Sequence, residues 1–280
     1  MATQQQGQSV LITGCSSGIG LCVAEGLKAR GYRVFATARK STDVAHLKEK
    51  GFESFVLDLN DSLSISNAVK NILALTNGKL DALFNNGAYA QPGAIEDLNR
   101  DLLRQQFETN LFGWLELTNL ILPVMRQQGH GRIIQNSSVL GLVSMPYRGA
   151  YNASKFALEG LTDTLRLELA DTGIYTSLIE PGPILSRFRE NAFNAFEKNI
   201  NLENSPHKEH YAKMSERLKK EGAAVKFTLP PEAVLKKVIL ALENPFPKPR
   251  YYVTFPTYLF GTLRRILPVR WLDKLLIKAV

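Results

Sequence analysis

The sequence predicts a single α/β domain in which a doubly wound parallel sheet lies between two layers of helices. Short runs rich in β-branched residues alternate with longer stretches of helical periodicity over most of the 280 residues. A hydrophobic fraction of 45% is enough to bury one large core. A three-layer single domain is therefore the simplest arrangement.

The elements follow from the periodicity along the chain. Strands are expected at residues 9–13, 33–38, 54–57, 81–85, 132–136 and 175–179, with a helical pattern in each gap. The first helix is predicted over 18–30, because Gly31 ends it. We place the catalytic domain at 1–247 and treat 248–280 as a separate C-terminal segment. Residues 186–228 interrupt the alternation, and either a substrate lid or an ordinary surface excursion fits them.

A glycine-rich turn follows the first strand and opens the first helix. Glycines let the backbone approach a pyrophosphate, whose charge is stabilised by free N–H groups at the helix N-terminus. The residues expected to contact a dinucleotide here are Thr13, Gly14, Ser16, Ser17, Gly18, Ile19 and Gly20. A turn of this kind without a ligand is the alternative, and the strand-turn-helix context disfavours it.

The end of the second strand bears on the choice of cofactor. An acidic residue there would bind the ribose hydroxyls of NAD, whereas a basic one would pair with the 2′-phosphate of NADP. This strand ends at Arg39 and Lys40, and no acid lies between Gly31 and Thr42. We therefore expect NADP(H), with Arg39 as the phosphate partner, because a guanidinium binds phosphate in bidentate geometry. A solvated basic pair is the alternative.

A tyrosine and a lysine four residues apart form the candidate catalytic pair. Tyr151 and Lys155 lie one turn apart on the same face of a helix. A cation at that range lowers a tyrosine pKa from about 10, which makes the phenol usable as an acid or base. The spacing is common, so the pair gains weight from its neighbours: the glycine turn, Asn136-Ser137-Ser138 and Asn85-Asn86-Gly87-Ala88.

With these motifs in this order, the chain resembles the short-chain dehydrogenase/reductase family from about residue 10 to residue 243. It is most similar to the bacterial NADP-dependent aldehyde or retinal reductases, and next to the retinol and hydroxysteroid dehydrogenases. The resemblance implies a Rossmann-like fold in which Ser138 binds the substrate oxygen and Tyr151 donates the proton. Lys155 would lower the tyrosine pKa and hold the nicotinamide ribose, and Asn110 would hold a water of the proton relay. Ser137 is the weaker serine candidate, because its spacing is off by one.

The resemblance also implies cofactor contacts beyond the glycine turn. These residues are Asp58, Leu59, Asn85, Pro181, Gly182, Ile184 and Ser186. Asp58 corresponds to an acid at the adenine ring, and Ile184 lies near the nicotinamide amide. Where the family usually has Asn-Asn-Ala-Gly, this chain has Asn-Asn-Gly-Ala from Asn85 onward. We expect the contact with the cofactor to be kept, although the local backbone conformation differs.

The substrate pocket is expected to be apolar. The residues placed near it are Leu140, Leu142, Val143, Met145 and Tyr147, together with Phe188, Phe193 and Phe196 of the lid. An apolar aldehyde or ketone, such as a medium-chain aldehyde, retinal or a steroid, fits such a pocket, and NADPH makes reduction the expected direction. A protein that binds NADP(H) without turnover is the alternative, which the presence of all four catalytic residues disfavours.

The C-terminal segment carries most of the net charge of +8. Residues 248–280 hold seven basic side chains and one acid, Asp273, which is +6. A helix is predicted over 269–280 with Val269, Leu272, Leu275, Leu276 and Ala279 on one face. With Trp271 and residues 258–260, this basic amphipathic segment suits peripheral contact with an anionic membrane, and docking on the domain or on a second subunit is the alternative.

Several classes of function are excluded or disfavoured. A body close to neutral argues against a broad nucleic-acid surface. Cys15 and Cys22 form no CxxC pair, the start of the chain lacks the pattern of a secretory signal, and the four histidines show no metal spacing. We expect a cytoplasmic protein, with the inner membrane surface as its one membrane contact. The family resemblance implies a homodimer or tetramer.

Overall fold

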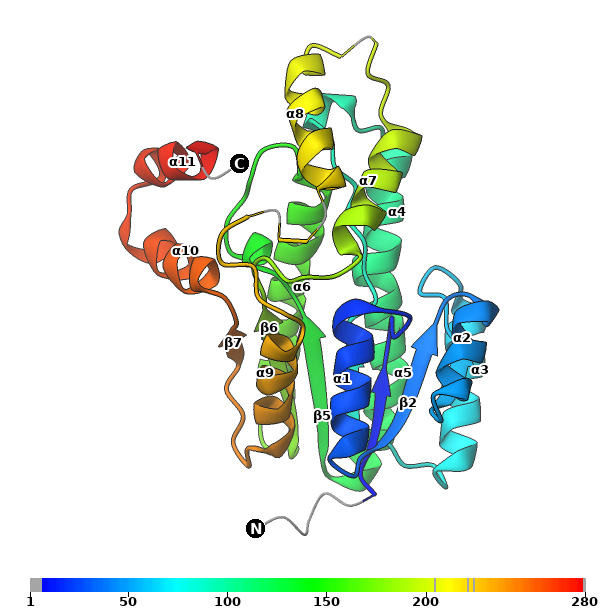
Figure 1. Ribbon diagram of the computed structural model, residues 1–280. Helices are drawn as coiled ribbons and strands as arrows, with labels where there is room; N and C mark the ends of the chain where they lie inside the picture. The colour runs from blue at the N-terminus through cyan, green and yellow to red at the C-terminus, as the bar shows by residue number, and fades with distance from the viewer. Residues whose placement is uncertain (1–6, 204, 221, 224, 279–280) are drawn as a thin grey trace.

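The computed structural model describes residues 7–203, 205–220, 222–223 and 225–278 (Figure 1). Seven parallel strands form one sheet in the order β3-β2-β1-β4-β5-β6-β7. Their bounds are β1 Ser9–Ile12, β2 Arg33–Ala38, β3 Glu53–Val56, β4 Ala82–Asn85, β5 Gly131–Asn136, β6 Ile174–Glu180 and β7 Arg250–Tyr252. The predicted doubly wound parallel sheet is confirmed.

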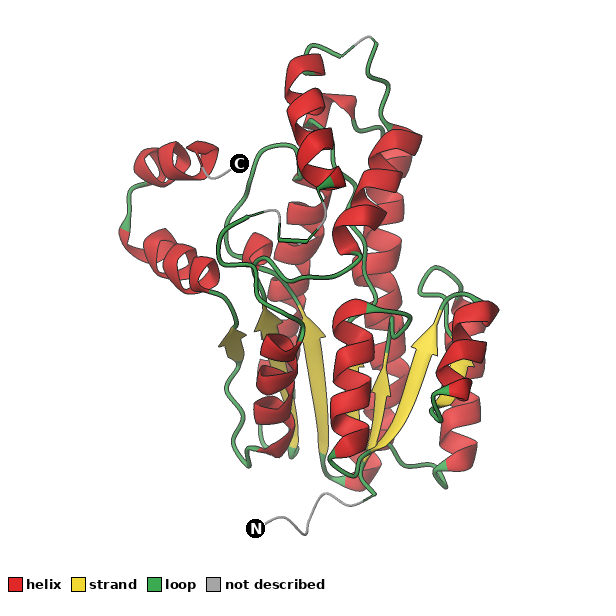
Figure 2. Ribbon diagram, viewed as in Figure 1, coloured by secondary structure: helices red, strands yellow, loops and turns green. Residues whose placement is uncertain are grey.

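Helices cover both faces of the sheet (Figure 2). One face packs against α1 (Gly18–Ala29), α2 (Ser41–Glu49) and α9 (Glu232–Glu243). The other packs against α3 (Ser62–Leu75), α5 (Gly113–Gln128) and α6 (Gly149–Glu168). The short elements are η1 (Ile95–Asp97), α4 (Arg100–Phe107), the π-helix η2 (Glu108–Phe112) and η3 (Val139–Gly141).

The first strand is apolar from Val10 to Ile12, and its surroundings show why. Val10 and Ile12 point into the core beneath α1, whereas Leu11 points into the core beneath α5. Successive side chains of a strand alternate between faces, and both faces are buried here, so the three successive positions are all apolar. Because the strand is packed on both sides, the position of its carboxyl end is fixed.

The structure differs from the expected domain boundary at residue 247. Strand β7 lies beyond that boundary and pairs in parallel with β6, so the sheet continues into the segment that was set apart. The strand has only three residues, too few for an alternating pattern, which is why periodicity missed it. Arg250 of β7 also donates to Glu159 and Asp163 of α6, at 3.1 and 2.6 Å, and thereby ties this edge to the catalytic helix.

The interrupting segment forms two helices beyond the carboxyl edge of the sheet (Figure 1). They are α7 (Phe188–Asn199) and α8 (Lys208–Lys219), and they pack on each other, with Phe196 against Tyr211 at 5.1 Å between ring centroids. Both helices supply side chains to the cavity at this edge. The segment therefore lies where a lid would lie.

The chain ends in α10 (Phe255–Ile266) and α11 (Val269–Lys278), which extend to one side of the domain (Figure 1). Leu272 and Leu276 are buried next to Phe260, whereas Val269 and Leu275 are exposed. The predicted apolar face was therefore wrong in part, because the helix docks along a narrower stripe. Ala279 lies outside the described residues. None of the described helices is long and apolar enough to cross a membrane.

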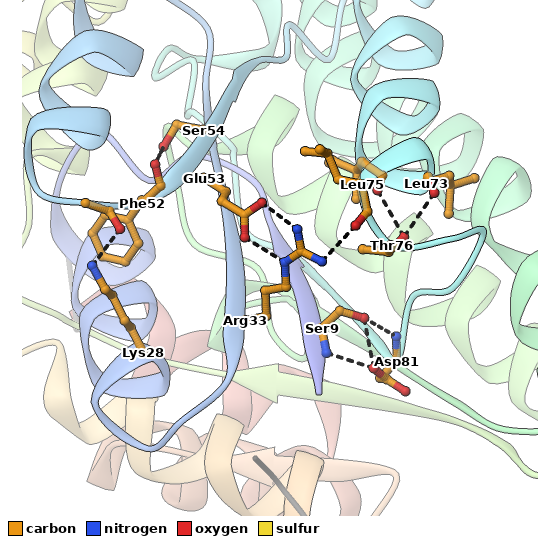
Figure 3. A network of polar contacts seen from close by, with 12 residues as sticks. Ser9, Lys28, Arg33, Phe52, Glu53, Ser54, Leu73, Leu75, Thr76 and Asp81 are labelled. Carbon is orange, nitrogen blue, oxygen red and sulfur yellow. Dashed lines mark hydrogen bonds and ion pairs between the residues drawn. The ribbon is translucent and has the colours of Figure 1, made fainter. Parts of the chain in front are cut away.

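Polar pairs fasten the amino-terminal end of the sheet (Figure 3). Arg33 forms a bidentate pair with Glu53 at 2.7 Å and also donates to the carbonyl of Leu75 at 2.8 Å. Asp81 accepts from the backbone and the hydroxyl of Ser9, at 2.7 and 2.8 Å. These contacts join the start of β1, β2 and β3 to the loop before β4.

Candidate active site

A cavity of about 1200 Å³ lies at the carboxyl ends of the strands. It is bordered by the turns that follow β1 to β6 and by the two helices of the lid. Ligands of open parallel sheets bind at this edge. It is therefore the place where the sequence motifs can act together.

The glycine turn is shaped by two close approaches. Gly14 has a φ of +71°, and a Cβ there would lie 2.6 Å from the Cα of Gly87. Gly18 has a φ of +57°, and its Cβ would meet the side chain of Ser186 at 2.9 Å. Only glycine fits these positions, so the turn keeps its backbone open toward the cavity. Its residues on the cavity wall are Thr13, Gly14, Ser16, Ser17, Gly18 and Ile19.

Two residues of the turn lie behind the cavity wall. A Cβ on Gly20 would lie 2.2 Å from the carbonyl oxygen of Gly14, so this glycine allows helix α1 to pack and does not itself line the cavity. Cys15 is fully buried, and burial raises the pKa of its thiol to about 12. Cys15 is thus a core residue.

The turn after β4 corrects one predicted contact. Asn85 was expected at the cofactor, yet it is buried on the α5 side, where its amide donates to Thr118 at 3.1 Å. Asn86 borders the cavity instead, because alternation along the strand turns it to the other side. Its amide donates to the carbonyl of Thr13 at 3.0 Å. The inverted motif places Gly87, rather than alanine, against Gly14.

The remaining predicted cofactor residues border the cavity. Arg39 lies exposed at its rim, beyond the end of β2. The others are Asp58, Leu59, Pro181, Gly182, Ile184 and Ser186. The open glycine turn and the residues after β2 and β3 together fit a nicotinamide dinucleotide cofactor.

Ser137, Ser138 and Tyr151 all border the cavity, but the hydroxyl of Ser137 is already engaged by a neighbouring carboxylate. The hydroxyl of Ser137 donates to Glu159 at 2.5 Å, which engages it in a buried contact on α6. Ser138 begins η3 and accepts from the backbone N–H of Leu140 at 3.1 Å. Of the two serines, Ser138 has the hydroxyl placed beside the tyrosine.

Burial raises the pKa of Tyr151 to about 12, and the Ser138 hydroxyl and the Arg148 guanidinium act in the opposite direction. Burial also lowers the pKa of Lys155 to about 7, against the opposite effect of Glu159. Lys155 Nζ donates to the carbonyl of Asn136 at 2.7 Å. Arg148, which the sequence had not indicated, is thus a second cation near the tyrosine, besides Lys155, whose Nζ lies 5.7 Å from the centroid of the Tyr151 ring.

Asn110 lies in the π-helix η2 between α4 and α5. Its amide donates to the carbonyl of Tyr89 at 3.0 Å and to the hydroxyl of Ser154 at 3.2 Å. A single turn of π-helix inside a longer helix is frequent at functional sites. Asn110 is fully buried and connects the loop after β4 to the helix that carries Tyr151.

The predicted substrate residues separate into two groups. Leu140, Met145 and Phe188 border the cavity, and the ring of Phe188 stands edge-on to Tyr151 at 5.4 Å between centroids. The others lie outside the cavity wall: Leu142, Val143, Tyr147, Phe193 and Phe196. Tyr147 packs instead against His207 of the lid, with 5.4 Å between the ring centroids.

Two further cavity residues were missed. Arg148 precedes Tyr151 by one helical turn, so the spacing used for Lys155 could have found it. Arg217 comes from α8, and only the folded lid brings it to the cavity. Met214 and Leu218 of the same helix complete this wall.

Comparison with known proteins agrees with this geometry. A family model described as short chain dehydrogenase matches residues 8–196. The uncharacterized oxidoreductase YbbO of Escherichia coli K12 is 44% identical, over 96% of this chain and 94% of its own. The NADPH-dependent 3-dehydrocapnine reductase of Ornithobacterium rhinotracheale is 34% identical, over 96% and 95%.

A solved short-chain dehydrogenase from Streptomyces avermitilis superposes with a TM-score of 0.77 at 29% identity, and the match covers 98% of this chain and 94% of the other. Sequence, fold and site thus agree on one class of protein. The chain belongs to the short-chain dehydrogenase/reductase family of oxidoreductases.

Proposed function

We propose that the protein reduces an apolar aldehyde or ketone to the alcohol with NADPH, and that Tyr151 supplies the proton. One observation carries the proposal: Ser138 and Tyr151 face the same cavity that receives the glycine turn. Leu140, Met145 and Phe188 give this part of the cavity an apolar wall. An apolar wall excludes water from the reacting carbonyl.

The side chains of the cavity have separate tasks in this reaction. The Ser138 hydroxyl binds the carbonyl oxygen, and the Tyr151 phenol donates its proton to that oxygen as the alcohol forms. NADPH supplies the hydride when it is bound. Lys155 lies one turn below Tyr151 and is placed to hold the nicotinamide ribose, and Asn110 holds the loop at Tyr89 against the catalytic helix.

The preference for NADPH rests on Arg39. It stands at the cavity rim after β2, where the family's cofactors place the adenosine ribose, and no acid follows it before helix α2. The 3-dehydrocapnine reductase, by its name, uses NADPH, which supports the same choice. A 2′-phosphate would form charge-assisted hydrogen bonds with the guanidinium.

We also propose peripheral contact with an anionic membrane through α10 and α11. Exposed apolar side chains on these helices are Phe255, Tyr258, Ile266, Val269, Trp271, Leu275 and Ile277. Arg264, Arg265, Arg270 and Lys274 lie among them. Phe255 and Leu259 also border the cavity, so an apolar substrate would enter from this side. Flotation with anionic vesicles, comparing the full chain with one ended at Pro268, tests the part of this contact that α11 supplies, and equal flotation would exclude α11 as an anchor.

Self-association is a further proposal. Exposed apolar residues follow the outer faces of α5 and α6, namely Leu115, Leu120, Leu161 and Leu167. Unpartnered patches of this kind mark interfaces between subunits. Light scattering after size-exclusion chromatography is expected to give the mass of a dimer or tetramer, and a monomer would contradict the proposal.

The reductase proposal is tested by cofactor oxidation in the presence of a carbonyl panel. Aliphatic aldehydes of increasing length, retinal and ketosteroids are each mixed with NADPH or NADH, and the loss of reduced cofactor is followed by absorbance. We expect turnover with NADPH and an apolar member of the panel. Tight NADPH binding without turnover across the panel would favour a nucleotide-sensing protein instead.

A further inference from the structure

Two of the arginines that border the cavity form no ion pair with a described carboxylate. These two are Arg148 and Arg217. Within the part of the chain that the structure describes, the one side-chain hydrogen bond of Arg148 runs from Nη1 to Met145 Sδ, at 3.3 Å. Neither guanidinium forms an ion pair with a described carboxylate.

The acids of the cavity lie at its other end. Among the described residues, Asp43 and Asp58 are the carboxylates on the cavity wall, and they follow β2 and β3. Ser138 follows β5, four strands away from β3 in the sheet order. Strands lie about 4.8 Å apart, so roughly 19 Å separates the two ends. This exceeds the screening length of about 10 Å, and the acids therefore leave the arginines uncompensated.

Arg148 and Arg217 are both half-buried at the wall of the same cavity, and each charge acts on the other. Burial lowers the pKa of Arg148 to about 10, and the charge of Arg217 acts in the same direction. Burial likewise lowers the pKa of Arg217. Two like charges that are partly desolvated and lack an acidic partner are unfavourable. Such an arrangement is typical of a site that receives a charge of opposite sign from a ligand.

We propose that the substrate carries an oxyanion, a carboxylate, sulfonate or phosphate, which Arg148 and Arg217 bind while Tyr151 protonates its carbonyl. The neighbouring wall is apolar, with Met214 and Leu218 from α8. The substrate is thus an apolar aldehyde or ketone that also carries an acidic group. This inference rests on the proposed reductase function and narrows its substrate class.

The cofactor phosphates are the competing ligand for these arginines. The pyrophosphate of a dinucleotide belongs at the start of α1. Arg148 begins the catalytic helix α6 instead, and α8, which carries Arg217, lies well beyond the start of α1 (Figure 1). The arginines therefore lie at the substrate end of the cavity.

The test uses substrates that differ only in charge. Straight-chain aldehydes that end in a carboxylate, and the methyl esters of the same acids, are compared as kcat/KM over a series of lengths with NADPH. We expect the wild type to prefer the acid, and this preference to fall at least about tenfold in Arg148→Gln and in Arg217→Gln, since a charged hydrogen bond contributes that much. Aldehydes that end in sulfonate or phosphonate identify the oxyanion.

Two variants serve as controls. Lys213→Gln removes the same charge from an exposed position on α8 outside the cavity wall and is expected to keep the preference. Arg148→Lys keeps the charge and is expected to retain part of the preference for the acid. Thermal unfolding of each variant shows whether the fold is intact.

A binding measurement separates this proposal from the reductase activity. Dodecanoate and dodecanol are titrated by calorimetry into protein saturated with NADP⁺. Tighter binding of dodecanoate that is lost in Arg148→Gln would support the anion site even if no aldehyde were turned over. Equal kcat/KM for acids and esters in the wild type would overturn it. So would weaker NADPH binding in Arg148→Gln with an unchanged preference, because the arginines would then serve the cofactor.

Discussion

At the amino-terminal end of the sheet Arg33 and Asp81 each have close partners, whereas at the carboxyl-terminal end Arg39, Arg148 and Arg217 have none among the described carboxylates. The paired charges join strands to one another (Figure 3). The unpaired ones border a cavity of about 1200 Å³. We infer that the paired charges at the amino-terminal end stabilise the fold, and that these unpaired arginines at the carboxyl-terminal end bind ligands. Substitutions at the amino-terminal end should therefore lower stability, and substitutions at the carboxyl-terminal end should lower activity or ligand binding.

The largest effect is expected at the carboxyl end from Tyr151→Phe. Without the phenol no side chain can donate the proton, so kcat should fall on the order of 10²- to 10⁴-fold, as loss of a general acid does. The Kd for NADPH and the midpoint of thermal unfolding should change little, because the ring stays in place. Steady-state kinetics and cofactor titration check this, and a fully active variant would remove Tyr151 from the mechanism.

Arg39→Asp should exchange the cofactor preference. Loss of a charge-assisted pair with the 2′-phosphate weakens NADPH by about ten- to hundredfold in kcat/KM, and the new carboxylate can accept from the ribose hydroxyls of NADH. Lys48→Asp, exposed on α2 and outside the cavity wall, is the control with the same change of charge. If the ratio of kcat/KM with NADPH to kcat/KM with NADH did not change, Arg39 would not be the phosphate partner.

At the amino end, Arg33→Ala should affect stability and not catalysis. The pair with Glu53 is about one third exposed on each side, so its loss together with the bond to Leu75 is expected to cost about 1 kcal/mol. Urea unfolding measures this loss. The kcat/KM of the variant should stay within about twofold, and a larger fall would show that the two ends are not independent.

The smallest expected effect is a pH-dependent contribution of Asp81 to the free energy of unfolding. Burial acts to raise its pKa, but hydrogen bonds from Ser9 and His130 outweigh burial, so the pKa lies below the ordinary value. A lowered pKa contributes stability above the unfolded value of about 4, and this contribution is lost as the pH falls through the folded value. Unfolding of the wild type and of Asp81→Asn should therefore converge toward acid pH. A difference that grew on acidification would contradict the assignment.

Much of the fold could be predicted because it depends on local periodicity. The six strands from β1 to β6 alternate with helices along the chain, and each carries a pattern of its own. Strand β7 could not be found, because three residues hold no pattern and its place is fixed by pairing with β6.

The site could be predicted where a motif follows a strand, because parallel strands bring their carboxyl ends to one edge. This places Gly14, Ser138 and Tyr151 together. The expected contact of Asn85 with the cofactor was not found, because the side to which this residue points depends on where β4 ends. Arg217 could not be found, since it is distant in the sequence and only the packing of α8 brings it near Tyr151.

The most direct test of the account is transfer of deuterium from NADPH deuterated at its transferable position. The protein is incubated with this cofactor and an apolar aldehyde, and the alcohol is analysed by mass spectrometry. The account predicts one deuterium on the carbinol carbon with the wild type and almost none with Tyr151→Phe. Tight cofactor binding with no labelled alcohol from any carbonyl of the panel would contradict it.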